Sequence, residues 1–140
     1  MLRNLKTSAT RIGVLSLALL AASFLKPDAA LAGGFARTCV DIQVQSDSGG
    51  AYLQARCTNA NGQEVPAQLR ISDYIANYDG NLSWALGGGG FHQSCSPSMH
   101  PNDRPILNAI CGNGRGGFSR TSINLDEKIS NQNGVLAIDR

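Results

Sequence analysis

A doubled turn segment is the feature that most constrains what this sequence can fold into. Residues 75–84 read Ile-Ala-Asn-Tyr-Asp-Gly-Asn-Leu-Ser-Trp, and 54 positions later residues 129–138 read Ile-Ser-Asn-Gln-Asn-Gly-Val-Leu-Ala-Ile. The Ile, Asn, Gly and Leu positions stay in register. The central Asp-Gly and Asn-Gly supply the positive φ angles that tight hairpin turns require. Each copy therefore predicts a β-hairpin, and the pair predicts a tandem repeat.

The first 32 residues have the pattern of a leader that is removed. Three basic residues precede an apolar run from Ile12 to Leu25, and Ala30-Leu31-Ala32 has the small-x-small shape of a cleavage site. This arrangement is typical of a secretory signal peptide, and the run is short for a membrane span. An uncleaved membrane anchor is the alternative. We expect cleavage, export to the periplasm or the medium, and a mature chain of residues 33–140.

Net charge gives no support to a nucleic-acid or membrane partner. The whole chain has 12 basic and 10 acidic residues, a formal net charge of +2. Four of the bases and one of the acids lie in residues 1–32, so eight bases and nine acids remain after cleavage. A nearly neutral domain has no basic patch with which to neutralise phosphates or anionic lipids. We expect no nucleic-acid partner and, after cleavage, no membrane association.

Four cysteines in the mature part, Cys39, Cys57, Cys95 and Cys111, predict a disulfide framework. An even number in an exported chain of this size is typical of disulfides, whereas zinc sites need close pairs such as C-x-x-C. No metal and no other cofactor is expected. The sequence alone allows three pairings, but two equal repeats most simply close Cys39–Cys57 and Cys95–Cys111. Each bond would stabilise the fold by about 3 kcal/mol.

Alternating apolar residues predict short strands in both repeats. Residues 40–44 alternate apolar and polar side chains, and residues 53–57 place Leu, Ala and Cys on one face; residues 107–111 repeat that face 54 positions on. Such alternation is typical of half-buried strands. Single helical turns are expected at residues 72–75 and 126–129, and no segment after the leader keeps helical periodicity for three turns. The sequence predicts an all-β fold.

The repeat divides the mature chain into units 33–86 and 87–140. Each unit has too few apolar residues for a core of its own, so we expect the two to share one. The connection Ala85–Gly90 contains four successive glycines, which predicts flexibility. The units could therefore pack within one chain, or exchange between two chains as a domain-swapped homodimer.

The ordered set of features resembles the cyanovirin-N homology family. Each unit gives Phe-x-x-x-Cys, a hairpin to a second Cys, a polar turn, alternating Ile or Leu, and Ile-x-Asn-x-Asp/Asn-Gly-x-Leu. The likeness spans residues 35–138, with the strongest local matches at 120–129 and 75–84. It implies two pseudo-symmetric halves, each a three-stranded sheet plus a β-hairpin, with strands exchanged between the repeats and one disulfide in each.

In function, the resemblance implies a lectin rather than an enzyme. The expected ligands are mannose-rich oligosaccharides or glycoproteins that carry them, with terminal α1,2-linked mannose favoured and up to two sites per chain. Each site would combine residues before one unit's first Cys, the turn after its second Cys, and the hairpin of the other unit. Carried onto this sequence, site 1 comprises Arg37, Thr38, Thr58, Asn59, Asn61, Asn131 and Asn133. Site 2 comprises Asn77, Asp79, Gln93, Ser94, Asn113 and Arg115.

The side-chain chemistry agrees with a sugar ligand but has a second interpretation. Sugar hydroxyls both donate and accept, so their sites are rich in amides, carboxylates and hydroxyls on fixed turns. Asn and Asp also favour turns for backbone reasons alone. Asn77 and Asn131 are the stronger candidates because Asp-Gly and Asn-Gly already satisfy the hairpin turns. Arg37 and Arg115 could donate to hydroxyls or remain solvated surface charges.

Catalytic chemistry finds little support in the sequence. His92 and His100 have no Ser or Cys in a nucleophile context, because the cysteines are expected to be oxidised. No enzymatic activity is predicted. The alternative to a lectin is a secreted, disulfide-stapled protein-interaction or inhibitor module with inactive sugar sites, which the glycine-rich turn after Cys111 favours.

Overall fold

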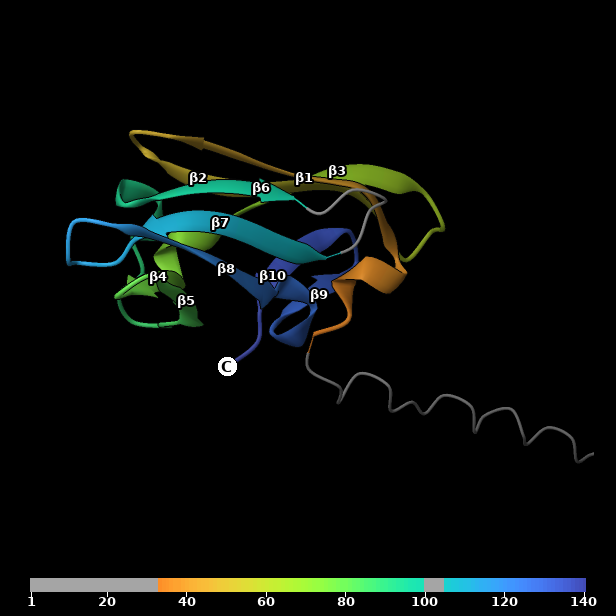
Figure 1. Cartoon of the computed structure of the whole chain (residues 1–140). Coiled ribbons are helices and arrows are strands. Elements are labelled where there is room, and N and C mark those ends of the chain that lie inside the picture. The colour runs from red at the N-terminus through yellow and green to blue at the C-terminus, as the bar shows by residue number, and fades with distance from the viewer. Residues whose placement is uncertain (1–32, 100–104) are drawn as a thin grey trace, which may run out of the picture. The chain divides into compact units, whose positions relative to one another are not determined.

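The computed structural model describes residues 33–99 and 105–140, in which short strands are joined by tight turns and single 3-10 turns (Figure 1). The elements before Ala85 are η3 (Phe35–Arg37), β1 (Cys39–Asp47), β2 (Gly50–Thr58), β3 (Glu64–Arg70), η4 (Ile71–Asp73), β4 (Ile75–Tyr78) and β5 (Asn81–Trp84). Those after Gly90 are η5 (Phe91–Gln93), β6 (Cys95–Met99), β7 (Ile106–Gly112), β8 (Phe118–Asn124), η6 (Leu125–Glu127), β9 (Ile129–Gln132) and β10 (Val135–Ile138). The leader predicted over residues 1–32 lies outside the described residues.

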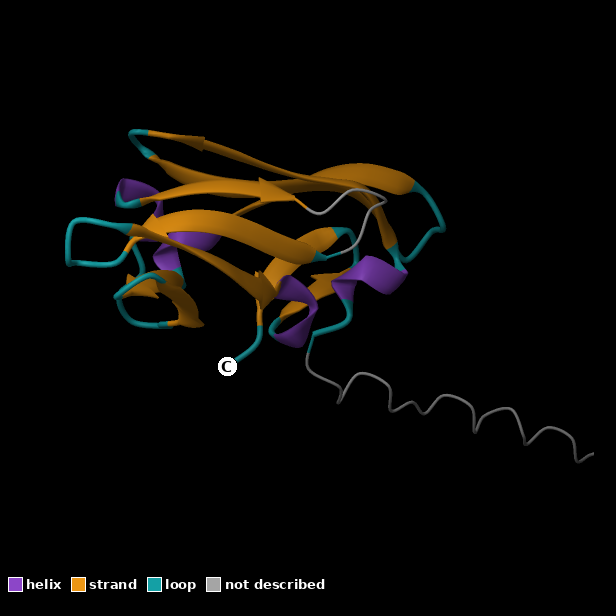
Figure 2. Ribbon diagram, viewed as in Figure 1, coloured by secondary structure: helices purple, strands orange, loops and turns teal. Residues whose placement is uncertain are grey.

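The predicted all-β class is confirmed. Figure 2 shows strands throughout the described part of the chain, with helical geometry confined to single turns. The turns η4 and η6 fall where the sequence predicts them, whereas η3 and η5 were not predicted. Within the described ranges, no helix has the length and apolar character needed to cross a membrane.

Two three-stranded antiparallel sheets form the framework, in the orders β1-β2-β3 and β6-β7-β8. A disulfide joins the first strand of each sheet to its central strand, β1 to β2 and β6 to β7, because Cys39 stands opposite Cys57 and Cys95 opposite Cys111. The pairing predicted from the repeat is therefore confirmed. Strand β1 differs from β6 by a bulge between Val40 and Gln43, which adds residues to the first sheet only.

The two hairpins are exchanged between the repeats. The β4–β5 hairpin follows the first sheet in sequence but packs against β8 of the second, and the β9–β10 hairpin packs against β3 of the first (Figure 1). A hydrogen bond from the Leu82 backbone N–H to Thr121 Oγ1, 3.1 Å long, joins β5 to β8. The predicted strand exchange is confirmed, and here it takes place within one chain.

Both hairpin turns have the backbone that their sequences predict. The φ angles are 52° and 95° at Asp79-Gly80, and 57° and 88° at Asn133-Gly134. Two successive positive φ angles define a type I′ turn, whose twist matches that of the strands that it joins. Asn and Asp tolerate the first of these positions, and Gly adopts the second without strain.

One hydrophobic core serves both repeats. Its fully buried side chains form pairs 54 or 56 positions apart in sequence: Phe35 with Phe91, Leu53 with Leu107, Cys57 with Cys111, Ile71 with Leu125, and Ile75 with Ile129. These residues belong to a single cluster, as predicted from the small size of each repeat. Removing either half would expose the apolar face of the other.

The glycine-rich connection is held by hydrogen bonds to η4. The backbone N–H of Gly89 donates to the Asp73 carbonyl at 3.3 Å, and that of Gly90 donates to the Ser72 carbonyl at 2.6 Å. A Cβ on Gly89 would lie 2.1 Å from the Ser72 carbonyl oxygen. Gly89 is therefore needed for close backbone approach, which the prediction of a flexible link did not include.

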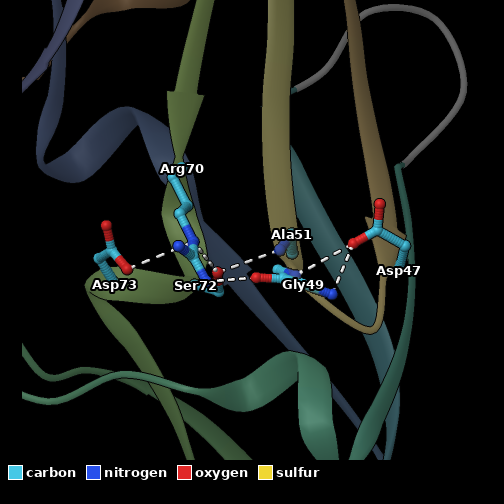
Figure 3. A network of polar contacts seen from close by, with 7 residues as sticks. Asp47, Gly49, Ala51, Arg70, Ser72 and Asp73 are labelled. Carbon is cyan, nitrogen blue, oxygen red and sulfur yellow. Dashed lines mark hydrogen bonds and ion pairs between the residues drawn. The ribbon is translucent and has the colours of Figure 1, made fainter.

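Polar contacts fasten the β1–β2 turn to η4 (Figure 3). The buried hydroxyl of Ser72 accepts a hydrogen bond from the Ala51 backbone N–H at 3.0 Å. The neighbouring Arg70 guanidinium donates to the Gly49 carbonyl oxygen and lies 3.5 Å from the Asp73 carboxylate. These contacts position the end of the first sheet relative to the chain that leads into the exchanged hairpin.

Replacing Ser72 with alanine is expected to lower the free energy of unfolding by about 1–2 kcal/mol, because the buried Ala51 N–H loses its acceptor. Urea unfolding of the oxidised protein measures the change. Ser48→Ala, an exposed serine in the adjacent turn, is the matched control and should stay within about 0.5 kcal/mol of the parent. Equal destabilisation by the two substitutions would contradict this role for Ser72.

Candidate functional site

Asn131 joins the β9–β10 hairpin to the first repeat. Its Nδ2 donates to Thr38 Oγ1 at 2.8 Å and to the Thr58 carbonyl oxygen at 2.9 Å. Its Oδ1 accepts from the Gly134 backbone N–H at 2.7 Å. One side chain thus closes its own hairpin turn and binds the strand ends of the opposite repeat.

Asn77 makes the same contacts for the β4–β5 hairpin. Its Nδ2 donates to Ser94 Oγ and to the Gly112 carbonyl oxygen, each at 2.9 Å, and its Oδ1 accepts from the Gly80 N–H at 2.7 Å. The repetition of all three bonds makes the two arrangements pseudo-symmetric. Asn77 and Asn131 therefore have structural roles. The Asp-Gly and Asn-Gly pairs do not hold the hairpin turns without them, contrary to the expectation from the sequence.

The loops after the second cysteines are also built alike. Asn59 Oδ1 accepts from the backbone N–H groups of Asn61 and Gln63 at 2.9 and 3.0 Å. Asn113 Oδ1 accepts from Arg115 and Gly117 at 2.9 and 3.1 Å. In each loop one asparagine side chain satisfies two backbone donors. The shape of each loop is thereby fixed.

The hairpin ends meet these loops through the residues at their tips. Asn133 Oδ1 accepts from the Ala60 backbone N–H at 2.6 Å. At the equivalent place in the other half, a Cβ on Gly114 would lie 3.2 Å from Asp79 Oδ1. The sequence assigned both Asn133 and Asp79 to sugar sites. Each lies at the junction of a loop with the hairpin of the other repeat.

Two polar surfaces result, which we call tip 1 and tip 2. Tip 1 comprises Arg37, Thr38, Thr58, Asn59, Asn61, Asn131 and Asn133, and tip 2 comprises Asn77, Asp79, Gln93, Ser94, Asn113 and Arg115. Direct hydrogen bonds join Asn131 to the Thr38 side chain and Asn77 to the Ser94 side chain. Within the described ranges, no hydrogen bond links the side chains of Arg37, Gln93 or Arg115 to the rest of their tip.

The two tips differ in charge. Tip 1 contains one charged side chain, the exposed Arg37. Tip 2 contains the exposed carboxylate of Asp79 and the exposed guanidinium of Arg115. Among the described residues, no group of three or more His, Cys, Asp or Glu is arranged to hold a metal ion. The chemistry that the tips offer is hydrogen bonding, through amide, hydroxyl and guanidinium donors and through amide, hydroxyl and carboxylate acceptors.

Sequence reasoning missed the residues on which the hairpin tips rest. A Cβ on Gly80 would lie 2.8 Å from Ser119 Oγ, and one on Gly134 would lie 2.6 Å from Val65 Cγ2. Val65 and Ser119 are 54 positions apart and occupy equivalent places in β3 and β8. The repeat offset could have paired them, but it could not have shown that they face the opposite hairpin.

A family model, the CVNH domain, matches residues 35–137, which include every residue of both tips. The chain belongs to the CVNH family. The match confirms the resemblance to this family that the residue pattern indicates. The match begins at Phe35 and ends within β10, so the CVNH domain accounts for both sheets and both exchanged hairpins.

Solved structures with the CVNH fold resemble the chain over most of their length. The alignment with a designed cyanovirin-N homolog lectin spans 75% of this chain and 98% of the lectin, with 31% identity and a TM-score of 0.63. The alignment with the Gibberella zeae CVNH protein spans 74% of this chain and 95% of that protein, with 31% identity and a TM-score of 0.60. The alignment with microvirin, whose structure was solved in complex with mannobiose, spans 76% of this chain and 98% of microvirin, with 30% identity and a TM-score of 0.59.

In this CVNH domain the Asn77→Ala substitution is expected to lower the free energy of unfolding by about 1–3 kcal/mol, because it removes three hydrogen bonds that hold the β4–β5 hairpin. Asn131→Ala should behave alike. Asn81→Ala, which alters an exposed residue of the same hairpin, is the control. Amide hydrogen exchange at Gly80 should accelerate in Asn77→Ala and not in Asn81→Ala. Unchanged protection in both variants would show that the asparagine does not hold the hairpin.

Proposed function

We propose that this chain is an exported lectin that binds mannose-rich oligosaccharides at tip 1 and tip 2, with terminal α1,2-linked mannose favoured. The observation that carries the proposal is that each tip unites loops of one repeat with the exchanged hairpin of the other, in the same hydrogen-bonded geometry twice. Membership of the CVNH family and the likeness to a mannobiose-bound structure support a sugar as the ligand. Processing after Ala32 and export are part of the proposal.

The groups that remain exposed at each tip are the ones that we assign to sugar contacts. At tip 1 these are the Arg37 guanidinium and the amides of Asn61 and Asn133. At tip 2 they are the Asp79 carboxylate, the Arg115 guanidinium and the Gln93 amide. Together they offer donors and acceptors, which is what vicinal hydroxyls require. Asn77 and Asn131 support these groups by fixing the hairpins.

Two sites on one rigid domain would raise the avidity for branched glycans. When one tip is bound, the second tip meets the other arms of the same glycan at a high effective concentration. Tip 1 carries one cation, whereas tip 2 carries one cation and one carboxylate, so we expect unequal affinities at the two tips. A protein with one active tip would lose this gain.

Calorimetric titration of the oxidised protein with mannose disaccharides of different linkage tests the proposal. The parent should bind α1,2-mannobiose at two sites per chain. Arg37→Ala and Arg115→Ala should each weaken one site by about tenfold or more, since a hydrogen bond from a charged donor contributes about 1.5–3 kcal/mol. Arg140→Ala, an exposed arginine outside both tips, is the matched control. Absence of heat with every mannose disaccharide, from protein shown to be folded, would refute the lectin.

A secreted protein-interaction or inhibitor module is the second candidate, favoured by one specific observation. Three asparagines of tip 1 use side-chain atoms within the protein: Asn59 for its own loop, Asn131 for Thr38 and Thr58, and Asn133 for Ala60. A partner protein that stays bound in saturating mannose would favour this module over the lectin.

A further inference from the structure

The outer face of the second sheet carries a cavity that belongs to neither tip. Its volume is about 210 Å³, which suits a single sugar ring better than a larger ligand. The side chains around it are those of Ser96, Ser98, Asn108, Ile110 and Arg120, over the backbone of β7 and β8. None of these residues contributes to the mannose sites proposed above.

Strand register places apolar surface beside these polar groups. Ile110 stands opposite Ser96 on β6 and opposite Arg120 on β8, so the three side chains share one face. Phe118 lies two residues before Arg120 on the same strand and therefore on the same face. The exposed fractions are 44% for Ile110 and 76% for Phe118. The face thus combines hydroxyls, an amide and a guanidinium with two uncovered apolar side chains.

The equivalent face of the first sheet also carries a cavity, of about 300 Å³, but the arginine beside it is paired with acids. Arg56 occupies the place of Ile110 and forms ion pairs of 2.8 Å with Asp41 and 2.7 Å with Glu64. The hydrogen bond that Arg56 donates to the Asp41 carboxylate, together with the charge of Glu64, raises the pKa of Arg56 above its ordinary value. Arg120 has no such partner: within residues 33–99 and 105–140 its side chain forms no hydrogen bond or ion pair. The second sheet therefore offers a free cation where the first does not.

We propose that this face is a third saccharide site, which binds a sugar ring that carries a carboxylate. The Arg120 guanidinium has the fork geometry that pairs with a carboxylate through two parallel hydrogen bonds. Ser96, Ser98 and Asn108 supply donors and acceptors for ring hydroxyls, and the apolar C–H face of the ring lies against Ile110 and Phe118. The inference rests on the proposed function only in taking a saccharide as the occupant.

Amide NMR of the oxidised chain distinguishes this site from the tips. Methyl β-glucuronide is the probe, and methyl β-glucoside, in which a hydroxymethyl group replaces the carboxylate, is its matched control. The glucuronide should shift amide signals of residues 96–98, 108–110 and 118–122, with an affinity at least tenfold above that of the glucoside. Equal responses to the two sugars would overturn the proposal. If the chain bound sodium acetate as tightly as the glucuronide, the carboxylate alone would be recognised, and the proposal that the face binds a sugar ring would be overturned.

Two substitutions complete the test. Arg120→Gln and Phe118→Ala should each weaken glucuronide binding by about tenfold, and Arg140→Ala should not. Thermal unfolding of each variant shows whether it is folded. Mannose binding is scored separately, at the amides of residues 58–63 and 112–117, so failure of the tips and failure of this face are distinguishable. Unchanged glucuronide affinity in folded Arg120→Gln would refute the site.

The backbone nitrogen of Gly33 contacts a carboxylate near the end of the chain, away from the face just described. It donates to Asp139 Oδ2 at 2.6 Å, while Ser130 Oγ donates to the other carboxylate oxygen at 3.0 Å. The next N–H, that of Gly34, donates to the Asp126 carbonyl at 2.9 Å. A Cβ on Gly33 would lie 1.9 Å from that carbonyl oxygen. Only glycine fits here, and its nitrogen faces a carboxylate.

We infer that leader cleavage completes this contact. Hydrolysis of the Ala32–Gly33 peptide bond by a signal peptidase adds one water molecule, leaving a carboxylate on Ala32 and an amino group on Gly33 that takes up a proton. The neutral N–H donor to Asp139 then becomes an ammonium, and the hydrogen bond becomes an ion pair. Processing at this bond would thus stabilise the mature fold.

Two forms of the mature protein test the inference, one that begins at Gly33 and one that keeps Ala32. At pH 7 the Gly33 form should melt about 4 °C higher. In Asp139→Asn the difference between the two forms should largely disappear, because no carboxylate remains to pair with the ammonium. Equal melting temperatures, or a difference that persists in Asp139→Asn, would overturn it. N-terminal sequencing of the exported protein should begin at Gly33.

Discussion

The fold depends on an asparagine that binds two parts of the chain at once. Asn131 satisfies the N–H of its own hairpin turn and the carbonyl of a strand end in the other repeat, and Asn77 does the same in the opposite direction. A four-residue strand pair has little stability by itself. Each hairpin therefore keeps its shape only while it is docked on the neighbouring repeat, and the tips exist only because of that docking.

Duplication gives two copies of the same framework, and substitution at a few exposed positions makes them chemically different. Asn133 in tip 1 corresponds to Asp79 in tip 2, and both adopt the same positive φ. On the sheet faces, Arg56 with its two acids corresponds to the apolar Ile110. The buried pairs are nearly unchanged because both repeats fill a single core. Function can diverge at the exposed positions without cost to that core.

The sequence predicted the parts of the fold that follow from local chemistry. The two hairpins follow from Asp79-Gly80 and Asn133-Gly134, and the disulfide pairing follows from the repeat. The roles of Asn77 and Asn131 could not be predicted locally, because their partners lie 17 to 93 positions away in sequence. The ordered glycine connection was missed for the same reason, since its acceptors are carbonyls of η4. The residues of both tips were named from the family resemblance, and their ligand remains a prediction.

Exchange of the hairpins links ligand binding to the integrity of the whole domain. Because each tip takes its loop from one repeat and its hairpin from the other, a ligand bound at either tip would hold the two repeats together. Its binding energy would therefore add to the stability of the folded domain. The disulfides stiffen the loop side of each tip, at Cys39–Cys57 and Cys95–Cys111, while the asparagines fix the hairpin side. A rigid tip loses little conformational entropy when a sugar binds, which is the advantage of building a polar site from crossed elements.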